Sequence, residues 1–143
     1  MTSPDLQDIR RAEERVRVAG HRTPVMTCSA LDQAAGRHLY FKCENLQKVG
    51  AFKIRGASNF ILKLPDEQAL RGVVTHSSGN HGQAVALAAG IRGIEAHVVM
   101  PSTSAAVKKR AVEGYGGIVV ECEPNEAARA EVAASWPASR CRS

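Results

Sequence analysis

Apolar residues follow two different periods in the second half of this sequence. Short runs rich in β-branched residues predict strands at 72–75, 96–100 and 118–121. Longer stretches, in which apolar residues return every three or four positions, predict helices at 81–89, 104–115 and 125–134. Short apolar strands that alternate with helices are typical of a parallel sheet covered on both faces. The pattern therefore predicts an α/β fold with an open parallel sheet of about three to four short strands and helices on both faces.

The first half of the sequence predicts a less regular set of elements. Ser3 followed by Pro4 is a helix-start signal and Gly20 a helix-stop signal, so a helix is expected between them. Three apolar residues lie on one side of that helix: Leu6, Ile9 and Val16. Further elements are expected as an extended piece at 25–26, a helix at 30–35, a strand at 38–43, a loop at 44–50 and a helix at 53–64. The last stretch, 135–143, has no period and predicts an unstructured tail.

Composition narrows the class of protein. The chain has 143 residues, of which 44% are hydrophobic and 23% charged, so a domain with its own core is expected. No apolar run is long enough for a membrane helix, and the first residues lack the apolar region of a secretory signal, so no membrane partner is expected. The cysteines form neither a zinc pattern nor a C-x-x-C pair: Cys28, Cys43, Cys122 and Cys141. These features predict a cytoplasmic protein with free thiols and no metal site.

The net charge of +5 gives a weak indication of an anionic partner. Basic and acidic residues are interleaved over the first 22 positions, and no continuous basic stripe occurs. Three Phe, two Tyr and one Trp are too few for a platform on which single-stranded nucleic acid would stack. We therefore expect no nucleic-acid partner, and a small anionic molecule fits the charge better.

A first candidate site is the polar segment 76–82, His-Ser-Ser-Gly-Asn-His-Gly, which connects a predicted strand to a predicted helix. In open α/β sheets, ligands bind beyond the carboxyl ends of the strands, and a helix N-terminus favours a carboxylate or phosphate. Gly79 and Gly82 would let a ligand approach the backbone closely. The alternative is that the serines and the asparagine merely cap the helix. The segment lacks the G-x-S-x-G of a hydrolase and the G-x-x-x-x-G-K of a nucleotide-binding loop.

A second candidate is Lys53, which lies between Phe52 and Ile54 near a predicted helix start and close to Arg55. Apolar neighbours, the positive end of a helix and a second cation would each lower the pKa of the lysine. A neutral amine can attack an aldehyde and form an imine. The alternative is a solvated lysine at the end of a helix.

Two motifs connect these candidates to a known family. The segment 44–57, E-N-L-Q-K-V-G-A-F-K-I-R-G-A, resembles the pyridoxal-phosphate attachment signature of the serine/threonine dehydratase family. The segment 75–84, T-H-S-S-G-N-H-G-Q-A, resembles that family's asparagine-containing loop. The likeness runs from the first helix to C-E-P near Cys122. The chain is thus identified as a member of this family of fold-type II pyridoxal-phosphate enzymes, which includes amino-acid racemases.

The resemblance implies serine racemase and serine/threonine dehydratase (ammonia-lyase) chemistry at one site. Lys53 would hold pyridoxal 5'-phosphate as an internal aldimine and would move the substrate α-proton on one face. Ser78 would act as the acid–base group on the opposite face. Two such groups on opposite faces are what stereoinversion needs.

The same resemblance assigns the binding residues. Asn80 would bond the ring hydroxyl of the cofactor, and Phe52 would pack near the ring. The substrate carboxylate would be held by Ser77 and His81, beside Ser78 and Asn80. The substrate would be a small amino acid, serine or threonine, and no metal ligand is assigned.

Animal members of the family bind an ATP effector near a dimer interface. The matching positions here are Cys28, Ser29, Ala30, Lys48, Val49, Gln83 and Tyr115. Cys28 and Val49 replace hydroxyl-bearing residues, which argues against a nucleotide site in this chain.

The resemblance covers only the front part of the family's chain, well under half. The family's glycine-rich phosphate loop, its hydroxyl residue opposite the pyridine nitrogen and its acidic Mg²⁺ or Ca²⁺ site have no counterpart in the sequence. Residues 1–52 would be the N-terminal part of an incomplete large domain and 53–134 the small α/β domain, and the likeness ends near Ala134. The chain therefore looks truncated. The alternative to an active enzyme is a catalytically inactive truncated isoform, an interaction fragment that pairs with a full-length subunit of this homodimeric family.

Overall fold

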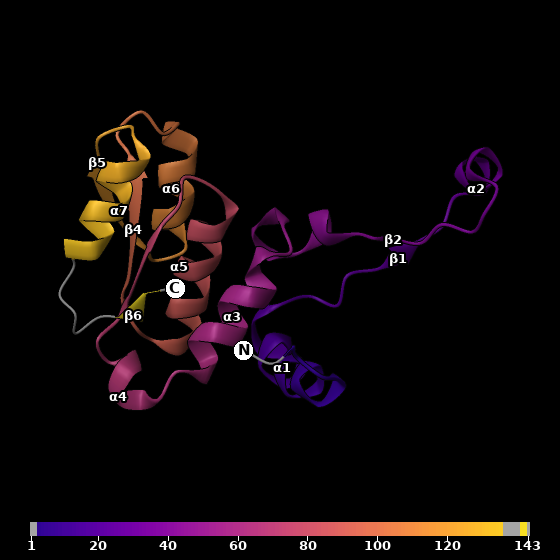
Figure 1. Cartoon of the computed structure of the whole chain (residues 1–143), viewed down its shortest axis with the longest axis horizontal. Coiled ribbons are helices and arrows are strands. Elements are labelled where there is room, and N and C mark those ends of the chain that lie inside the picture. The colour runs from indigo at the N-terminus through magenta and orange to yellow at the C-terminus, as the bar shows by residue number, and fades with distance from the viewer. Residues whose placement is uncertain (1–2, 136–140, 143) are drawn as a thin grey trace.

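The computed structural model describes residues 3–135 and 141–142 (Figure 1). Its helices are α1 (Leu6–Ala19), α2 (Ser29–Ala35), α3 (Lys53–Lys63), α4 (Asp66–Ala69), α5 (Asn80–Arg92), α6 (Ala106–Gly114) and α7 (Glu126–Ser135). Two 3-10 turns, η1 (Glu44–Leu46) and η2 (Lys48–Gly50), precede α3. The strands are β1 (Val25–Met26), β2 (Phe41–Lys42), β3 (Val73–His76), β4 (Ala96–Pro101), β5 (Ile118–Cys122) and β6 (Cys141–Arg142).

The main sheet has the strand order β5-β4-β3-β6, and all its neighbours are parallel. Successive residues of a strand point to opposite faces, and the core is divided accordingly. On one face, Val98 of β4 packs with residues of α5 and α6. On the other face, Val74 and Val99 pack with Ala133 of α7. The predicted α/β fold, with a parallel sheet covered by helices on both faces, is confirmed.

Helix α3 packs against α5 and fixes the position of the candidate lysine. Ile54 and Ile61 of α3 are fully buried in one cluster with the alanines of α5. Arg92, the last residue of α5, donates hydrogen bonds to the carbonyl oxygens of Ile61 and Leu64 at the end of α3. Because the C-terminal ends of the two helices meet there, α3 and α5 run in the same direction. Their N-terminal ends therefore lie toward the same end of the molecule (Figure 1).

Residues 24–43 form an arm that extends away from the rest of the protein (Figure 1). β1 and β2 pair antiparallel at the base of the arm, with Met26 opposite Phe41, and α2 lies at its tip. No residue of α2 is buried. The predicted strand 38–43 is thus shortened to the two residues of β2, because only the two-residue β1 is available to pair with it.

The first helix differs from its prediction at its start and on its apolar side. The N-cap is Asp5, and the expected start at Ser3 and Pro4 is wrong. The Asp5 carboxylate accepts a hydrogen bond from the Asp8 N–H, and the Asp8 carboxylate accepts one from the Asp5 N–H. Leu6 and Ile9 are both 60% exposed, and Ala19 is the buried residue of α1. The apolar side of this helix is therefore largely uncovered.

The predicted unstructured tail, 135–143, is wrong where the structure describes it. Ser135 is the last residue of α7, and Cys141–Arg142 forms β6 beside β3. β3 would otherwise be a sheet edge with unpaired N–H and C=O groups, which any extended segment can satisfy whatever its side-chain pattern. Residues 136–140 and 143 lie outside the described part of the chain.

Candidate functional site

Lys53 is the first residue of α3 and lies at the positive end of the helix dipole. Its ammonium nitrogen is 5.2 Å from the centroid of the Phe52 ring, which is a cation–π contact. The Phe52 side chain is itself 59% exposed. The pair is therefore accessible from outside the chain.

The expected burial of Lys53 is wrong for this chain, because its side chain is exposed. Successive residues of a helix are separated by about 100° around its axis. Ile54 points into the core and is fully buried, so Lys53 faces outward. The described part of the chain, including the neighbouring Phe52 ring, thus leaves the Lys53 side chain exposed to solvent.

The polar segment 76–82 forms the predicted link between a strand end and a helix start. β3 ends at His76 and α5 begins at Asn80. The Ser77 N–H donates to the carbonyl of Val99 at 3.1 Å, and the Gly79 N–H donates to Ser77 Oγ at 3.3 Å. Ser77, Ser78 and His81 are half-buried and Asn80 is exposed.

The side chains of this turn do not serve as the N-cap of α5. The N-cap position is Gly79, and no side chain caps the helix there. The alternative interpretation, in which the serines and the asparagine merely cap the helix, is therefore wrong. The half-buried hydroxyl groups of Ser77 and Ser78 lie directly before this helix start, and Ser77 Oγ accepts from the Gly79 N–H.

The structure brings Lys53 and the turn to the same end of the molecule. The parallel packing of α3 and α5 places both helix N-termini there, and α5 starts directly after the carboxyl end of β3. This arrangement combines a primary amine, two half-buried hydroxyl groups and a helix N-terminus. Such a set can react with an aldehyde and can hold an anionic group.

A second set of contacts, which the sequence did not point to, fixes the start of α3. Arg55 donates to both carboxylate oxygens of Glu44, each at 2.7 Å, and Thr23 Oγ1 donates to Glu44 Oε1 at 2.6 Å. The hydrogen bonds from Arg55 lower the pKa of Glu44 to about 2. Glu44 and Arg55 both belong to the motif 44–57, but they are eleven residues apart, whereas side chains in contact along one helix are three or four residues apart. Only the folded path of η1 and η2 brings them together.

Gln47 is the second anchor of this region that sequence reasoning missed. Its side chain is buried, and its Oε1 accepts from the N–H of His21 at 2.6 Å while its Nε2 donates to the carbonyl of His21 at 2.7 Å. Oε1 also accepts from the N–H of Lys48 at 2.9 Å. The base of the arm is thereby tied to the turn that leads into Lys53.

A family model described as "Pyridoxal-phosphate dependent enzyme" matches residues 16–141. The chain belongs to this pyridoxal-phosphate-dependent family. The serine racemase of Dictyostelium discoideum is 48% identical over 129 residues, which cover 90% of this chain and 40% of that protein. The β-hydroxyaspartate dehydratase of Paracoccus denitrificans (strain Pd 1222) is 47% identical over 131 residues, covering 92% of this chain and 42% of that protein.

A solved structure of maize serine racemase has the same fold. It superposes with a TM-score of 0.93 at 46% sequence identity, covering 99% of this chain and 44% of the maize chain. The pyridoxal-phosphate-dependent enzyme family identified from the two motifs is thus confirmed, as is its fold type. The chain spans about two fifths of the length of the relatives that it matches.

The residues present can be compared with the parts of pyridoxal phosphate. The exposed amine of Lys53 is free to meet its aldehyde, and the open face of Phe52 lies where a planar ring could pack. Ser77, Ser78 and Asn80 supply hydroxyl and amide groups next to an uncapped helix N-terminus. This donor set fits the aldehyde and the ring of the cofactor.

Four of the seven positions that match the family's nucleotide site keep polar side chains but do not form one group in the structure: Ser29, Lys48, Gln83 and Tyr115. Lys48 in η2 and Gln83 in α5 belong to elements that pack together, and Tyr115 at the end of α6 packs on the cluster of Ala86 and Val98. Ser29 lies in α2, at the exposed tip of the arm and far from the others (Figure 1). The nucleotide effector stays a prediction.

Within residues 3–135 and 141–142, no three His, Cys, Asp or Glu side chains gather closely enough to bind a metal ion. No helix in the same part of the chain has the length and apolar character needed to cross a bilayer.

Proposed function

We propose that this chain carries the lysine and the serine–asparagine turn of a pyridoxal-phosphate-dependent racemase and dehydratase of small amino acids. The observation that carries the proposal is the position of Lys53 and the 76–82 turn at the N-terminal ends of two parallel, packed helices. The relatives named above support the substrate class, because serine and β-hydroxyaspartate both carry a hydroxyl group on the β-carbon. Serine or threonine is the proposed substrate.

The proposed roles follow the chemistry of each side chain. The cofactor supplies an electron sink for the substrate carbanion when it is bound. Lys53 Nζ is proposed to hold the cofactor and then to take or return the substrate α-proton, and Ser78 Oγ to do so from the opposite face. Asn80 and Phe52 are proposed to orient the cofactor ring. Ser77, Ser78, Asn80 and His81 are proposed to hold the substrate carboxylate, helped by the dipole of α5.

Cofactor binding by this chain is expected to be weak. The glycine-rich loop that grips the phosphate in the family has no counterpart in the sequence. Hydrogen bonds to a charged group contribute about 1.5–3 kcal/mol each, so the absence of roughly three of them lowers affinity by several powers of ten. The exposed amine of Lys53 can still react, but it would not hold the cofactor tightly.

The proposal is tested by incubating the chain with millimolar pyridoxal phosphate and fixing the reacted amines with cyanoborohydride. Peptide mass spectrometry then locates the added mass. We expect preferential labelling at Lys53, because the N-terminus of α3 attracts the phosphate and so brings the aldehyde close to this amine. Lys63 is the matched control, since it is an exposed lysine at the opposite end of the same helix.

Two variants complete the test. Lys53→Ala should abolish the preferential label, and Ser78→Ala should leave it in place, because the serine is assigned to proton transfer rather than to attachment. Equal labelling of Lys53 and Lys63 in the unaltered chain would remove the catalytic proposal.

A second candidate function is supported by the uncovered apolar residues. Val25, Met26, Tyr40 and Phe41 of the arm are between 42% and 73% exposed, and Leu6 and Ile9 of α1 are 60% exposed. Apolar surface on this scale is typical of an interaction site. On this proposal the chain is an inactive fragment that pairs with a full-length subunit, and a relative's activity should change when the two are purified together.

The proposed compartment is the cytoplasm. Cys28, Cys43 and Cys122 are free thiols in the structure, and free thiols persist in a reducing environment.

A further inference from the structure

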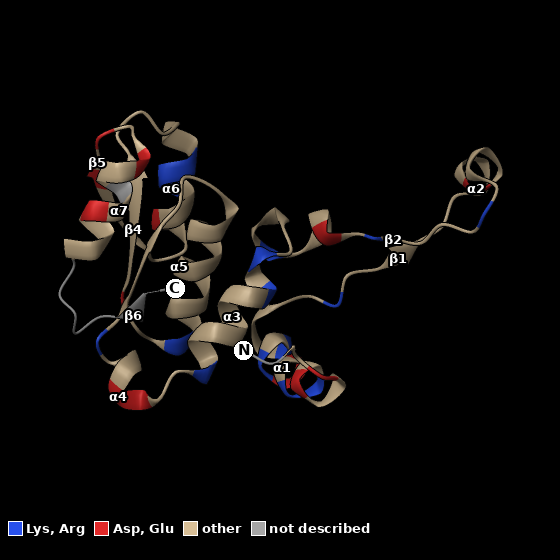
Figure 2. Ribbon diagram, viewed as in Figure 1, with Lys and Arg blue, Asp and Glu red and all other residues tan. Residues whose placement is uncertain are grey.

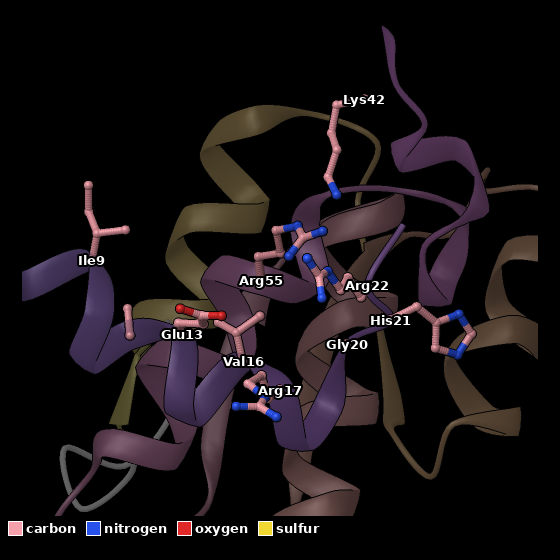
Figure 3. A pocket seen from close by; sticks show the side chains of 10 residues that line it. Ile9, Glu13, Val16, Arg17, Gly20, His21, Arg22, Lys42 and Arg55 are labelled. Atoms are coloured by element: carbon pink, nitrogen blue, oxygen red, sulfur yellow. The ribbon is translucent and has the colours of Figure 1, made fainter. Parts of the chain in front are cut away.

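A cavity of about 790 Å³ lies between α1 and the base of the arm (Figure 3). Its walls include Ile9 and Val16 of α1, the stretch from Gly20 to Arg22, Lys42 of β2 and Arg55 of α3. The cavity is open on one side, and its size suits a small molecule. Figure 2 shows basic residues where the arm joins the rest of the protein.

Three cationic side chains converge on one part of this cavity. Lys42 Nζ donates to the carbonyl of Thr23 at 2.6 Å, and Arg55 Nη2 lies 3.5 Å from Thr23 Oγ1, so both groups gather around the same residue. Arg22 precedes Thr23 in the sequence. Figure 3 shows the Lys42 ammonium and the guanidinium groups of Arg22 and Arg55 pointing toward the same region.

The positive charge of this group is only partly neutralised. Glu44 binds Arg55 and Glu13 lines the wall formed by α1, whereas Arg17, Arg22, Lys42 and Arg55 are all in the lining. The guanidinium of Arg22 has no hydrogen-bond or ion-pair partner among the described residues. The four cations therefore outnumber the two carboxylates Glu13 and Glu44. An excess of positive charge in a recess attracts an anion more strongly than the same charge spread over a surface.

Hydrogen-bond donors are also left over for a ligand. An arginine has five N–H groups and a lysine ammonium has three. Arg55 uses Nε and Nη2 on Glu44, which leaves its Nη1, and Lys42 uses one N–H on Thr23. One parallel pair of Arg22 N–H groups, the Nη1 of Arg55 and the remaining N–H groups of Lys42 are thus available for the oxygens of one anionic group.

This cavity is distinct from the lysine site. Lys53 does not line it. Residues two apart on a helix are separated by about 200° around the axis, so Lys53 and Arg55 point to opposite sides of α3. An anion bound by Arg55 would therefore be independent of a cofactor attached to Lys53.

We propose that the cavity formed by α1 and the base of the arm is a binding site for the phosphate or carboxylate group of a small anionic molecule, held by Arg22, Lys42 and Arg55. Arginine forks bind both oxygens of such groups through charge-assisted hydrogen bonds. The site goes beyond the proposed enzymatic function and does not depend on it.

The test is isothermal titration calorimetry of the full chain at low ionic strength, with inorganic pyrophosphate in one series and citrate in the other. We expect saturable binding of at least one anion, with an affinity that falls as salt is added. Stronger binding of pyrophosphate identifies a phosphate ligand, and stronger binding of citrate identifies a carboxylate ligand. The absence of saturable heat with both anions overturns the proposal.

Three variants locate the site. Arg22→Gln should weaken binding about tenfold or more, because it removes a charge and a fork of donors. Arg37→Gln is the matched control on the exposed arm and should leave affinity unchanged. Lys53→Ala should also leave it unchanged, so that a failure of the proposed enzymatic function does not affect this result. Equal weakening by Arg22→Gln and Arg37→Gln would mean diffuse charge attraction and would refute the site.

Discussion

At the scale of single residues, the motif 44–57 builds the start of α3 as well as supplying the candidate lysine. The sequence places Arg55 beside Lys53 and suggests that its charge acts on the lysine. In the structure, that charge is taken up by Glu44 through two hydrogen bonds of 2.7 Å. Arg55 therefore acts first on the carboxylate that ties the arm to α3.

Glu44→Gln should change how stability depends on pH. Arg55 lowers the pKa of Glu44 from 4.5 to about 2, so the carboxylate stabilises the fold above the pKa of the unfolded chain. This stabilisation should be lost as pH falls from about 4.5 to about 2. At neutral pH the substitution should cost about 1–2 kcal/mol, a value reduced because the ion pair is partly exposed to water.

Chemical denaturation at a series of pH values measures the effect of Glu44→Gln. The variant should lose less stability than the unaltered chain between pH 4.5 and pH 2. Glu13→Gln is the control, because Glu13 is exposed on α1 and forms no ion pair with the residues that the structure describes. Identical pH profiles for the unaltered chain and Glu44→Gln would show that the ion pair contributes nothing.

At the scale of elements, the sheet and its helices could be predicted because each has a clear period. β3, β4 and β5 begin and end within one or two residues of their expected positions, since most of their residues are apolar or β-branched and those of β3 and β4 are mostly buried. The predicted strand at 38–43 failed because its apolar residues, such as Tyr40 at 73% exposure, have no core to pack against. The periodicity of the sequence shows where apolar residues recur, but it does not show whether another element packs over them.

The turn before α5 depends on a close approach that only glycine allows. A Cβ at Gly82 would lie 2.7 Å from Val98 Cγ1 and 3.1 Å from the carbonyl oxygen of Ser77. Val98 is fully buried and cannot move aside. Gly82→Ala should therefore destabilise the fold by about 1–3 kcal/mol and displace the turn that carries Ser77 and Ser78.

Gly79→Ala is the matched control for Gly82→Ala, because a Cβ there would meet no atom within 4 Å. Thermal unfolding followed by circular dichroism compares the two variants. Gly79→Ala should unfold within a few degrees of the unaltered chain, whereas Gly82→Ala should unfold clearly earlier. Equal midpoints would show that helix α5 shifts away from β4 without cost.

At the scale of the whole molecule, the candidate site could be predicted only in part. The motifs identify Lys53, Ser78 and Asn80, and the parallel helices explain why they belong to one end of the fold. The solvent exposure of Lys53 could not be predicted, because burial depends on everything that packs over a residue. The apolar sides of α1 and the arm are likewise exposed, because no described element packs over them. The relatives are more than twice as long as this chain.

The arm should contribute almost nothing to the stability of the described fold. Beyond the β1–β2 pair, the arm forms hydrogen bonds within itself, such as the one from the Leu39 N–H to the Asp32 carboxylate at 2.8 Å. No residue of α2 is buried against the rest of the protein. Replacing residues 27–40 by Asn-Gly would join the paired Met26 and Phe41 through a two-residue hairpin turn. Urea denaturation should then give a free energy of unfolding within about 0.5 kcal/mol of the unaltered chain.

A core substitution is the positive control for shortening the arm, and a pairing assay is the second measurement. Ile61→Ala, at a fully buried position on α3, should cost about 2–5 kcal/mol in the same assay, which shows that the assay detects real losses. A loss above about 1 kcal/mol on shortening the arm would mean that the arm supports the core after all. If the arm tip instead serves pairing with a full-length subunit, the shortened chain should fold normally and fail to pair. Stability and association would then be separated in one variant, because the arm tip lies outside the core that holds the fold together.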